Sequence, residues 1–335
     1  IFGKVKLENN FFDSFREDYP DFNKWFNGKS NEISYTCYYG NEIGAFLYIK
    51  KENETENYSN ITPAFSPKKR LKIGTLKVAL NGFKIGERFL KIIFDNALKQ
   101  KVSEIYVTIF DKRPEQIRLI SLLENFGFKY HGVKKTSSGE EKVYVRDFTP
   151  KFDKENPKNT YPYFSKKNNT WFVSIYPMYH TELFPDSILN TESPIDFVEN
   201  EPHRNAISKV FVSHSKERTI RKGDIIVFYR TGGIYKGVVT TIGIVESTIN
   251  PLNDFTHLIN LCKNKSVLTE DKLREFWERY GKYKPFVVNF LYTYSLPKKL
   301  NLAKLIELGI IASPSQMPRG FSKLNKSAGS LLPKL

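Results

Sequence analysis

The chain has 335 residues, of which 40% are hydrophobic and 15% aromatic, and it carries a net charge of +16. This length exceeds one ordinary core, so two domains are expected. No apolar run reaches the roughly 20 residues that cross a bilayer, and no secretory segment opens the sequence. Two cysteines, Cys37 and Cys262, exclude a disulfide framework, so we expect a cytoplasmic protein with no membrane partner. The start at Ile1 rather than Met predicts a fragment whose upstream part is missing.

The positive charge is concentrated toward the C-terminal end. Residues 1–150 contain 25 basic and 19 acidic residues, residues 151–200 contain 5 and 7, and residues 201–335 contain 22 and 10. A concentrated basic surplus favours a polyanionic partner, most simply nucleic acid. The alternative is a lysine-rich composition that only keeps the surface solvated.

Residues 1–150 predict an α/β domain with a mixed sheet. Helices are indicated by apolar residues three or four positions apart, and strands by alternation or by short apolar runs. In chain order, the sequence predicts two short helices within 11–28, a hairpin of strands 33–39 and 45–50, a strand over 73–80, a helix over 87–99, a strand over 104–110, a helix over 114–125, and strands over 128–133 and 142–148.

Residues 71–87, LKIGTLKVALNGFKIGE, are the most informative stretch of the chain. They predict a strand, a glycine-containing turn and the start of an amphipathic helix. A turn that opens a helix directs unpaired N–H groups at one point, with the positive end of the helix dipole behind them. Such a turn suits a pyrophosphate, so a phosphate-bearing cofactor is expected.

The element order and the segment Asn81-Gly82-Phe83-Lys84-Ile85-Gly86 resemble the GNAT superfamily of N-acetyltransferases over most of residues 1–148. In that family a bulged strand leads into Gln/Arg-x-x-Gly-x-Gly/Ala, whose amides hold the pyrophosphate of acetyl-CoA. A Rossmann dinucleotide site is the competing hypothesis, but Gly-x-Gly-x-x-Gly is absent. The GNAT resemblance implies acetyl-CoA as the cofactor and the following binding residues: Val78, Leu80, Asn81, Gly82, Lys84, Ile85, Gly86 and Glu87.

Three positions depart from the family pattern. Asn81 replaces Gln/Arg, Lys84 replaces the middle Gly, and Leu123 stands where many members carry a Tyr that protonates the leaving thiolate. Leucine has no proton to give, so the acid is unknown. Candidates for acid or base, each with a structural alternative, are Glu87, Glu104, Asp111, Tyr106 and Tyr130.

Beyond residue 150 the pattern changes to short strands after a polar segment, 151–170, that is expected to be a linker. Residues 171–297 predict a small β-barrel with helical insertions, and 298–335 a C-terminal extension packed on it. The predicted strands are 171–175, 210–213, 224–229, 235–246 and 286–292, and the predicted helices are 194–199 and 270–280.

The turn and strand Lys222–Tyr229, Arg230 and the strand Thr241–Glu246 resemble the PUA-like superfamily, which includes EVE, ASCH and YTH-type modules. This resemblance implies recognition of RNA or of a modified base by stacking in an aromatic pocket. The alternative is that these aromatic residues form the core. The implied nucleic-acid contacts are Tyr179, His180, Arg204, Arg221, Arg230 and Trp277.

The complete prediction is an α/β (α+β) GNAT-like mixed-sheet domain followed by a small PUA-like β-barrel. The expected function is acetyl-CoA-dependent N-acetylation by a protein that recognises nucleic acid, with an unknown amine acceptor. The rival hypothesis is a non-catalytic nucleic-acid-binding protein in which the GNAT-like domain is a degenerate scaffold. The histidines and cysteines lack metal-ligand spacing. The domain order resembles the C-terminal part of bacterial proteins with an upstream PIN-type nuclease domain, whose acidic motif is absent here.

Overall fold

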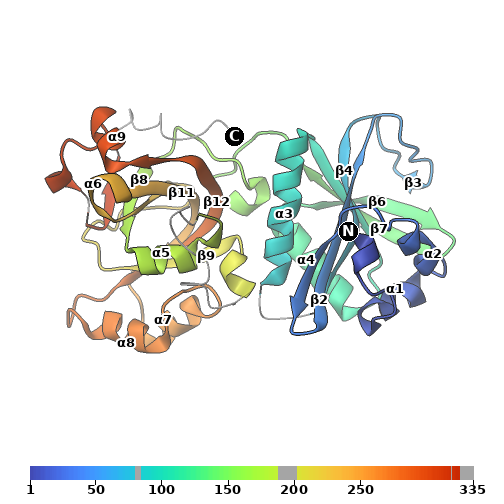
Figure 1. Cartoon of the computed structure of the whole chain (residues 1–335), viewed down its shortest axis with the longest axis horizontal. Coiled ribbons are helices and arrows are strands. Elements are labelled where there is room, and N and C mark those ends of the chain that lie inside the picture. Colours follow the sequence, from blue (N-terminus) through green and yellow to red (C-terminus); the bar gives the residue numbers. More distant parts are fainter. Residues whose placement is uncertain (80–83, 188–201, 318, 325–335) are drawn as a thin grey trace. The chain divides into compact units, whose positions relative to one another are not determined.

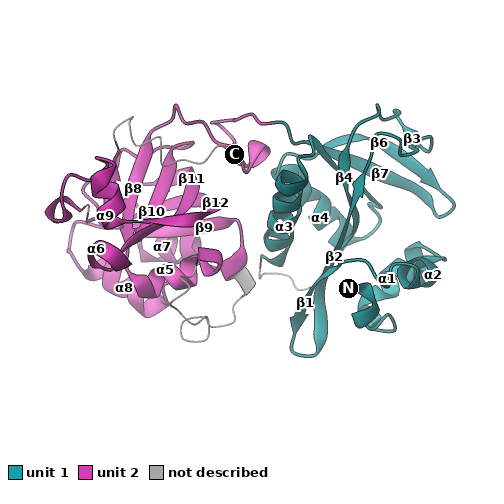
Figure 2. Cartoon of the chain, turned by 45° about the horizontal axis from the view of Figure 1, so that its top comes forward, with its two compact units in different colours: residues 1–149 teal, residues 150–335 magenta. Residues whose placement is uncertain are grey.

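The computed structural model describes residues 1–79, 84–187, 202–317 and 319–324 (Figure 1). The chain divides into two compact units, Ile1–Thr149 and Pro150–Leu335 (Figure 2). Within the described residues, no helix is both long enough and apolar enough to span a membrane.

Unit 1 is a mixed sheet in the strand order β1-β2-β4-β5-β7-β6-β3. Helices α3 and α4 lie on one side of this sheet, and α1 and α2 lie on the other (Figure 2). The strands are β1 (Tyr35–Tyr39), β2 (Glu42–Glu52), β3 (Ile61–Thr62), β4 (Arg70–Val78), β5 (Glu104–Ile109), β6 (Lys129–Thr136) and β7 (Gly139–Asp147). The helices are η1 (Phe2–Lys4), η2 (Asn10–Phe12), α1 (Asp13–Asp18), α2 (Phe22–Asn27), α3 (Ile85–Gln100) and α4 (Pro114–Asn125).

These elements confirm the predicted mixed α/β sheet. Helix α3 forms because its apolar residues recur at helical spacing and bury one face against the sheet, notably Phe89, Ile93 and Phe94. On the other side of the sheet, aromatic residues of the N-terminal helices pack on β2 around Phe46. The predicted elements omit β3, because a two-residue strand leaves no pattern in the sequence.

Strands β4 and β5 are parallel but pair only at one end. Their register runs from Leu71 opposite Ile105 to Ile73 opposite Val107, whereas β4 continues to Val78. The register of β4 with β2 shifts at Gly74, which is an extra residue opposite Tyr48 and Ile49. A Cβ at Gly74 would lie 2.7 Å from the Tyr48 ring, so glycine permits this bulge. A bulged strand that parts from its parallel neighbour before a helix is the GNAT-like arrangement.

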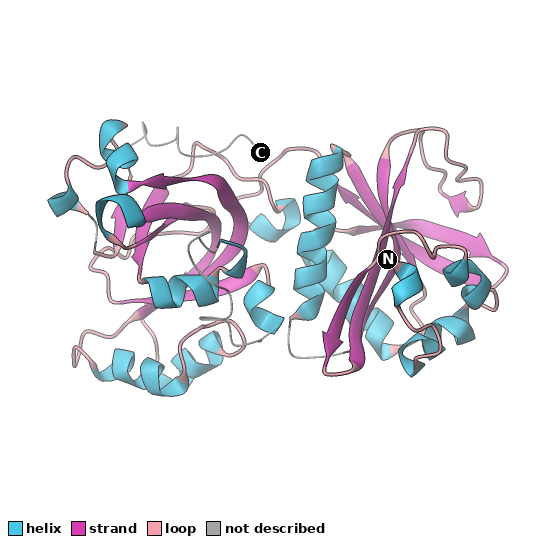
Figure 3. Cartoon of the chain, viewed as in Figure 1, coloured by secondary structure: helices cyan, strands magenta, loops and turns pink. Residues whose placement is uncertain are grey.

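Unit 2 is a curled half-barrel sheet in the strand order β13-β8-β10-β11-β12-β9 (Figure 3). Its strands are β8 (Thr170–Ile175), β9 (Ser208–Ser213), β10 (Ile225–Arg230), β11 (Val238–Ile249), β12 (Phe286–Asn301) and β13 (Phe321–Lys323). Its helices are η3 (Pro157–Thr160), α5 (Pro177–Leu183), η4 (Pro185–Ser187), η6 (Pro202–Asn205), α6 (Gly233–Lys236), α7 (Phe255–Cys262), α8 (Glu270–Glu278), α9 (Leu302–Glu307) and η7 (Pro314–Gln316).

Unit 2 differs from the sequence prediction in the segments before its first strand and after residue 297, and in the start of one strand. The segment 151–170, expected as a linker, packs on the sheet: Tyr161 is buried, and its hydroxyl donates a 2.8 Å hydrogen bond to the Tyr292 carbonyl. The segment after residue 297 continues β12 and adds β13, which pairs with β8. The strand expected to begin at Tyr235 begins at Val238 because α6 precedes it. The helix predicted over 194–199 lies outside the described residues.

Candidate functional site

A cavity of about 640 Å³ lies in unit 1 where β4 and β5 diverge. One part of its wall consists of β4, the start of α3 and the inner face of α4, including Val78, Gly86 and Leu119. The other part consists of the α1–α2 segment and the β6–β7 hairpin, including Tyr19 and Glu141. The cavity wall therefore draws residues from elements on both sides of the sheet.

Within the described residues, the β4 edge that borders this cavity has backbone groups without a strand partner. The N–H of Ala79 donates a 2.9 Å hydrogen bond to the Gly44 carbonyl in the direction of β2. Because the bonding direction alternates along an antiparallel pair, Leu76 and Val78 direct their N–H and C=O groups away from β2 and into the gap. Strand β5 pairs with β4 only as far as Ile73, so it leaves these groups without a strand partner. They are donors and acceptors for an extended amide-bearing ligand.

The start of α3 lies at one end of the cavity. Lys84, the N-cap, has a left-handed backbone with φ of 52°, and Ile85 and Gly86 follow in the first turn. A Cβ at Gly86 would lie 2.5 Å from Cδ2 of Leu122, so this glycine lets α3 pack closely on α4. Leu122 also lines the cavity. The glycine therefore has a packing role as well as the predicted place at the cofactor turn.

The predicted cofactor residues fall into three groups. Val78, Lys84, Ile85 and Gly86 line the cavity. Glu87 does not, and its carboxylate lies 3.7 Å from the Lys84 ammonium. The remaining three, Leu80, Asn81 and Gly82, lie outside the described residues.

The acid and base candidates chosen from the sequence do not line the cavity. Glu104 lies at the opposite end of β5, where its carboxylate is 2.5 Å from Nε of Arg70. Tyr130 is exposed on β6, and the Tyr106 hydroxyl is buried against Glu52. The exposed Asp111 is likewise absent from the cavity wall, and the fully buried Leu123 belongs to the core. These residues have structural contacts instead.

Glu141 and Tyr19 are a hydrogen-bonded pair in the cavity wall that was not predicted from the sequence. Glu141 is 3% exposed, accepts a 2.5 Å hydrogen bond from the Tyr19 hydroxyl and lies 3.4 Å from Nζ of Lys134. Burial, together with the Glu141 charge, raises the pKa of Tyr19, so the phenol stays protonated. Strand β7 begins three residues earlier than predicted, at Gly139. Alternation with the buried Val143 then indicates that Glu141 faces inward, which is the signal that was available.

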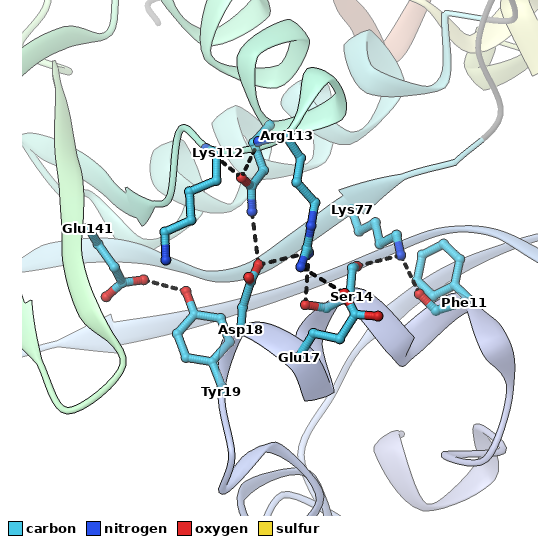
Figure 4. A network of polar contacts seen from close by, with 10 residues as sticks. Phe11, Ser14, Glu17, Asp18, Tyr19, Lys77, Lys112, Arg113 and Glu141 are labelled. Atoms are coloured by element: carbon cyan, nitrogen blue, oxygen red, sulfur yellow. Dashed lines mark hydrogen bonds and ion pairs between the residues drawn. The ribbon is translucent and has the colours of Figure 1, made fainter.

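Hydrogen bonds from β4 and from the start of α4 hold α1 and the residues next to it at the cavity wall (Figure 4). Nη1 of Arg113, at the start of α4, donates 3.0 Å hydrogen bonds to the Ser14 carbonyl and to Asp18. From β4, Nζ of Lys77 donates to the Phe11 carbonyl at 2.5 Å and to the Ser14 hydroxyl at 2.7 Å. Together with the bond from Tyr19 to Glu141, these contacts hold α1 from three elements of the sheet and helix layers.

In unit 2 the structure corrects the role predicted for His180. Its ring is fully buried against Phe184, and Nε2 lies 2.7 Å from the Thr240 hydroxyl. Burial, with the charges of Arg230 and Lys299, lowers the pKa of His180 to about 3. A neutral ring enclosed in the core is not available for stacking on a base.

The other predicted nucleic-acid residues are dispersed among several elements. Arg204 is buried, and its guanidinium lies 3.4 Å from Glu182. Arg230 is 9% exposed at the end of β10, Tyr179 packs partly buried on the core, and Trp277 is half-buried under Lys284. Arg221 is exposed in the turn before β10. Within the residues described in the structure, no group of His, Cys, Asp and Glu has the arrangement of a metal site.

Comparisons with known proteins give only distant structural likenesses. No family model matches the chain, and no curated protein matches it. Arabidopsis thaliana Naa50 bound to the bisubstrate analogue CoA-Ac-MVNAL is 20% identical, with a TM-score of 0.28 over 37% of this chain and 80% of that one. A GNAT-family acetyltransferase from Streptococcus agalactiae is 17% identical, with a TM-score of 0.30 over 42% and 79%. The ribosomal-protein-S18-alanine N-acetyltransferase from Escherichia coli is 15% identical, with a TM-score of 0.24 over 36% and 72%.

Likenesses at this level carry no argument about activity. The GNAT-like fold of unit 1, about 40% of the chain, is recognised by its own topology: the bulged β4, its parallel and diverging partner β5, and α3 between them. The curled half-barrel of unit 2 has no assigned family.

Proposed function

We propose that unit 1 is an acetyl-CoA-dependent N-acetyltransferase. The observation that carries this proposal is the unpaired backbone edge of Leu76 and Val78, which lines a cavity that leads to the first turn of α3. The amides of a pantetheine arm match this edge in the way that an added strand does. The N–H groups at the start of α3 suit the phosphates at the other end of the cofactor.

The residues on the α1 side of the cavity suit deprotonation of an amine. Acetyl-CoA supplies an activated acetyl thioester. Among the carboxylates that line the cavity, we assign Glu141 as the one that accepts a proton from the acceptor ammonium, directly or through one water. The Tyr19 hydroxyl and Lys134 hold that carboxylate in one orientation. Since Leu123 has no proton, the CoA thiolate takes its proton from solvent. A nucleobase amine, an aminoacyl group and a protein lysine all satisfy this chemistry.

Calorimetric titration of acetyl-CoA into two variants of one residue tests the proposed binding edge. Val78→Pro removes the N–H that faces the cavity, whereas Val78→Ala keeps it and removes only side-chain atoms. The Val78 N–H makes no ladder bond to β2, so proline leaves that pairing in place. We expect Val78→Pro to weaken binding at least about tenfold, the equivalent of one hydrogen bond, and Val78→Ala to weaken it much less. Equal affinities in the two variants would refute the assigned edge.

For unit 2 we propose nucleic-acid binding by a PUA-like module. The support is the basic surplus of residues 201–335, 22 basic against 10 acidic residues, and the exposed Arg221. If phosphates supply the affinity, binding to a single-stranded RNA should fall steeply between about 50 and 200 mM salt. A flat salt response would exclude phosphate contacts. RNA binding in a chain that does not bind acetyl-CoA would favour the alternative of a non-catalytic scaffold.

A further inference from the structure

Lys72 differs in its contacts from other lysines of the cavity in unit 1. Within the described part of the chain, Nζ of Lys72 has no hydrogen-bond acceptor, and its closest ion-pair partner is Oε1 of Glu52 at 4.0 Å. Other cavity lysines donate hydrogen bonds to carboxylate, hydroxyl or carbonyl oxygens; they are Lys29, Lys50, Lys77 and Lys134. Lys72 therefore lines the cavity with an ammonium that is held only by the distant Glu52 carboxylate and by the Tyr106 ring, whose centroid lies 5.7 Å from Nζ.

The carboxylate nearest to Lys72 is already engaged by other groups. Oε2 of Glu52 accepts hydrogen bonds from the hydroxyls of Tyr58 at 3.0 Å and Tyr106 at 2.7 Å. Its Oε1 lies 3.5 Å from Nζ of Lys50, closer than Lys72. The negative charge of Glu52 is thus shared, and it stabilises the Lys72 ammonium only weakly.

The surroundings of Lys72 shift its protonation equilibrium toward the neutral amine. Burial lowers the pKa of this lysine, and the charges of Lys134 and Lys50 act in the same direction, while Glu52 and Glu141 oppose them. Its side chain is nevertheless 24% exposed and borders the cavity. A larger neutral fraction makes this amine a better nucleophile than a lysine with an ordinary pKa.

Lys72 also lies beside the point where β4 and β5 begin to diverge. It precedes Ile73, the last β4 residue that pairs with β5. The unpaired edge of β4 runs from Val78 through Leu76 toward this point. A pantetheine arm with its phosphates at the start of α3 therefore directs its thioester end toward Lys72.

We propose that Lys72 is an acetyl acceptor within the chain, so that unit 1 acetylates itself at this residue. The inference rests on the proposed binding of acetyl-CoA. The neutral Nζ attacks the thioester carbonyl carbon, the C–N bond forms, the C–S bond breaks, and CoA leaves as the thiolate. One proton leaves the ammonium before the attack, and the second is taken up by the thiolate. The products are N-acetyllysine, CoA–SH and one proton. The acetyl group adds bulk to the cavity wall and hinders access by external amines.

Intact-mass measurement and peptide mapping after incubation of the full chain with acetyl-CoA test this proposal. Lys77, in the same cavity but with two hydrogen bonds, and the exposed Lys51 of β2 are the internal controls. We expect Lys72 to be acetylated at least about tenfold faster than either control, because a bound thioester raises the effective concentration at one amine. Excess CoA should suppress the reaction at Lys72 and leave Lys51 unaffected. Lys72→Arg should remove this acetyl group and Lys51→Arg should not.

Parallel calorimetry with acetyl-CoA separates the possible failures. Binding with no preferential acetylation of Lys72 would overturn the inference and leave the proposed function in place. Acetylation of Lys72 at the rate of Lys51, unaffected by excess CoA, would show ordinary surface chemistry and also overturn it. Absence of both binding and acetylation would remove the proposed function together with the inference.

Discussion

Tyr19 and Glu141 stand 122 positions apart in the sequence, and the hydroxyl of the first donates a 2.5 Å hydrogen bond to the carboxylate of the second. The bond joins the segment after α1 to β7 and closes one wall of the cavity. Glu141 is buried and has Lys134 as its cationic partner at 3.4 Å. The geometry of the cavity wall beside α1 therefore depends on this pair.

Tyr19→Phe removes the hydroxyl and leaves a buried carboxylate with one partner fewer. A hydrogen bond to a charged group contributes about 1.5–3 kcal/mol, and we expect a loss of that size in the free energy of unfolding. Urea denaturation measures it. Tyr130→Phe, at an exposed tyrosine of β6, is the matched control and should stay within about 0.5 kcal/mol of the parent. Equal stability of both variants would contradict the structural importance of the pair.

Glu141→Gln keeps the size of the side chain but removes its ability to accept a proton as a base. Measured with an amine that the parent protein acetylates, kcat/KM for acetyl transfer should be lower in this variant by about 10²–10⁴-fold at neutral pH. The matched variant Glu104→Gln changes a carboxylate that lies outside the cavity beside Arg70, so it should lower stability and leave the transfer rate in place. Parent-like transfer by Glu141→Gln would exclude this residue as the base.

Gly86→Ala should be coupled to the side chain of Leu122. The added methyl group meets Cδ2 of Leu122 at 2.5 Å, so one of the two must shift. Overpacking costs about 1–3 kcal/mol, partly offset by the better helix propensity of alanine. We expect the double variant with Leu122→Ala to be at least about 0.5 kcal/mol more stable than the sum of the two single changes. Leu119→Ala should combine additively with Gly86→Ala, and additivity in both cycles would contradict the close contact.

Because His180 is buried in its neutral form, we expect the protein to lose stability in mild acid. Its pKa is lowered to about 3 in the folded state by burial and by Arg230 and Lys299, so the unfolded chain binds the proton first. The resulting loss in the free energy of unfolding is absent well above the unfolded-state pKa of about 6.5. It grows as the pH falls and reaches about 2 kcal/mol at pH 5. Urea midpoints at pH 7 and pH 5 measure it. His180→Gln should lack this part of the pH dependence, whereas His257→Gln on α7 should keep it; identical pH dependence in all three proteins would contradict the account.

The sequence was sufficient for the elements whose pattern is local. Helix α4 runs over the predicted 114–125, and α3 exceeds its predicted range by two residues at the start and one at the end. The mixed sheet followed from the order of these elements. The role of His180 could not be predicted, because burial under Phe184 depends on how the second sheet curls.

Less of the site could be predicted from the sequence, because the residues in contact there lie far apart in the chain. Arg113 meets Asp18 across 95 positions, and no spacing rule connects them. Lys72 appears in the sequence as one of several basic residues in an alternating strand. Among the described residues its Nζ has no hydrogen-bond acceptor, and Oε1 of Glu52, its nearest carboxylate oxygen, lies closer to Lys50; neither relation can be seen in the sequence.

Residue-resolved amide hydrogen exchange, measured with and without saturating CoA, tests the central claim most directly. The account predicts that CoA slows exchange at Leu76 and Val78, whose N–H groups face the cavity. The intervening Lys77, whose N–H already points to β2, should change little. CoA that saturates the protein and leaves Leu76 and Val78 unprotected would contradict binding along β4, as would the absence of any binding at millimolar CoA.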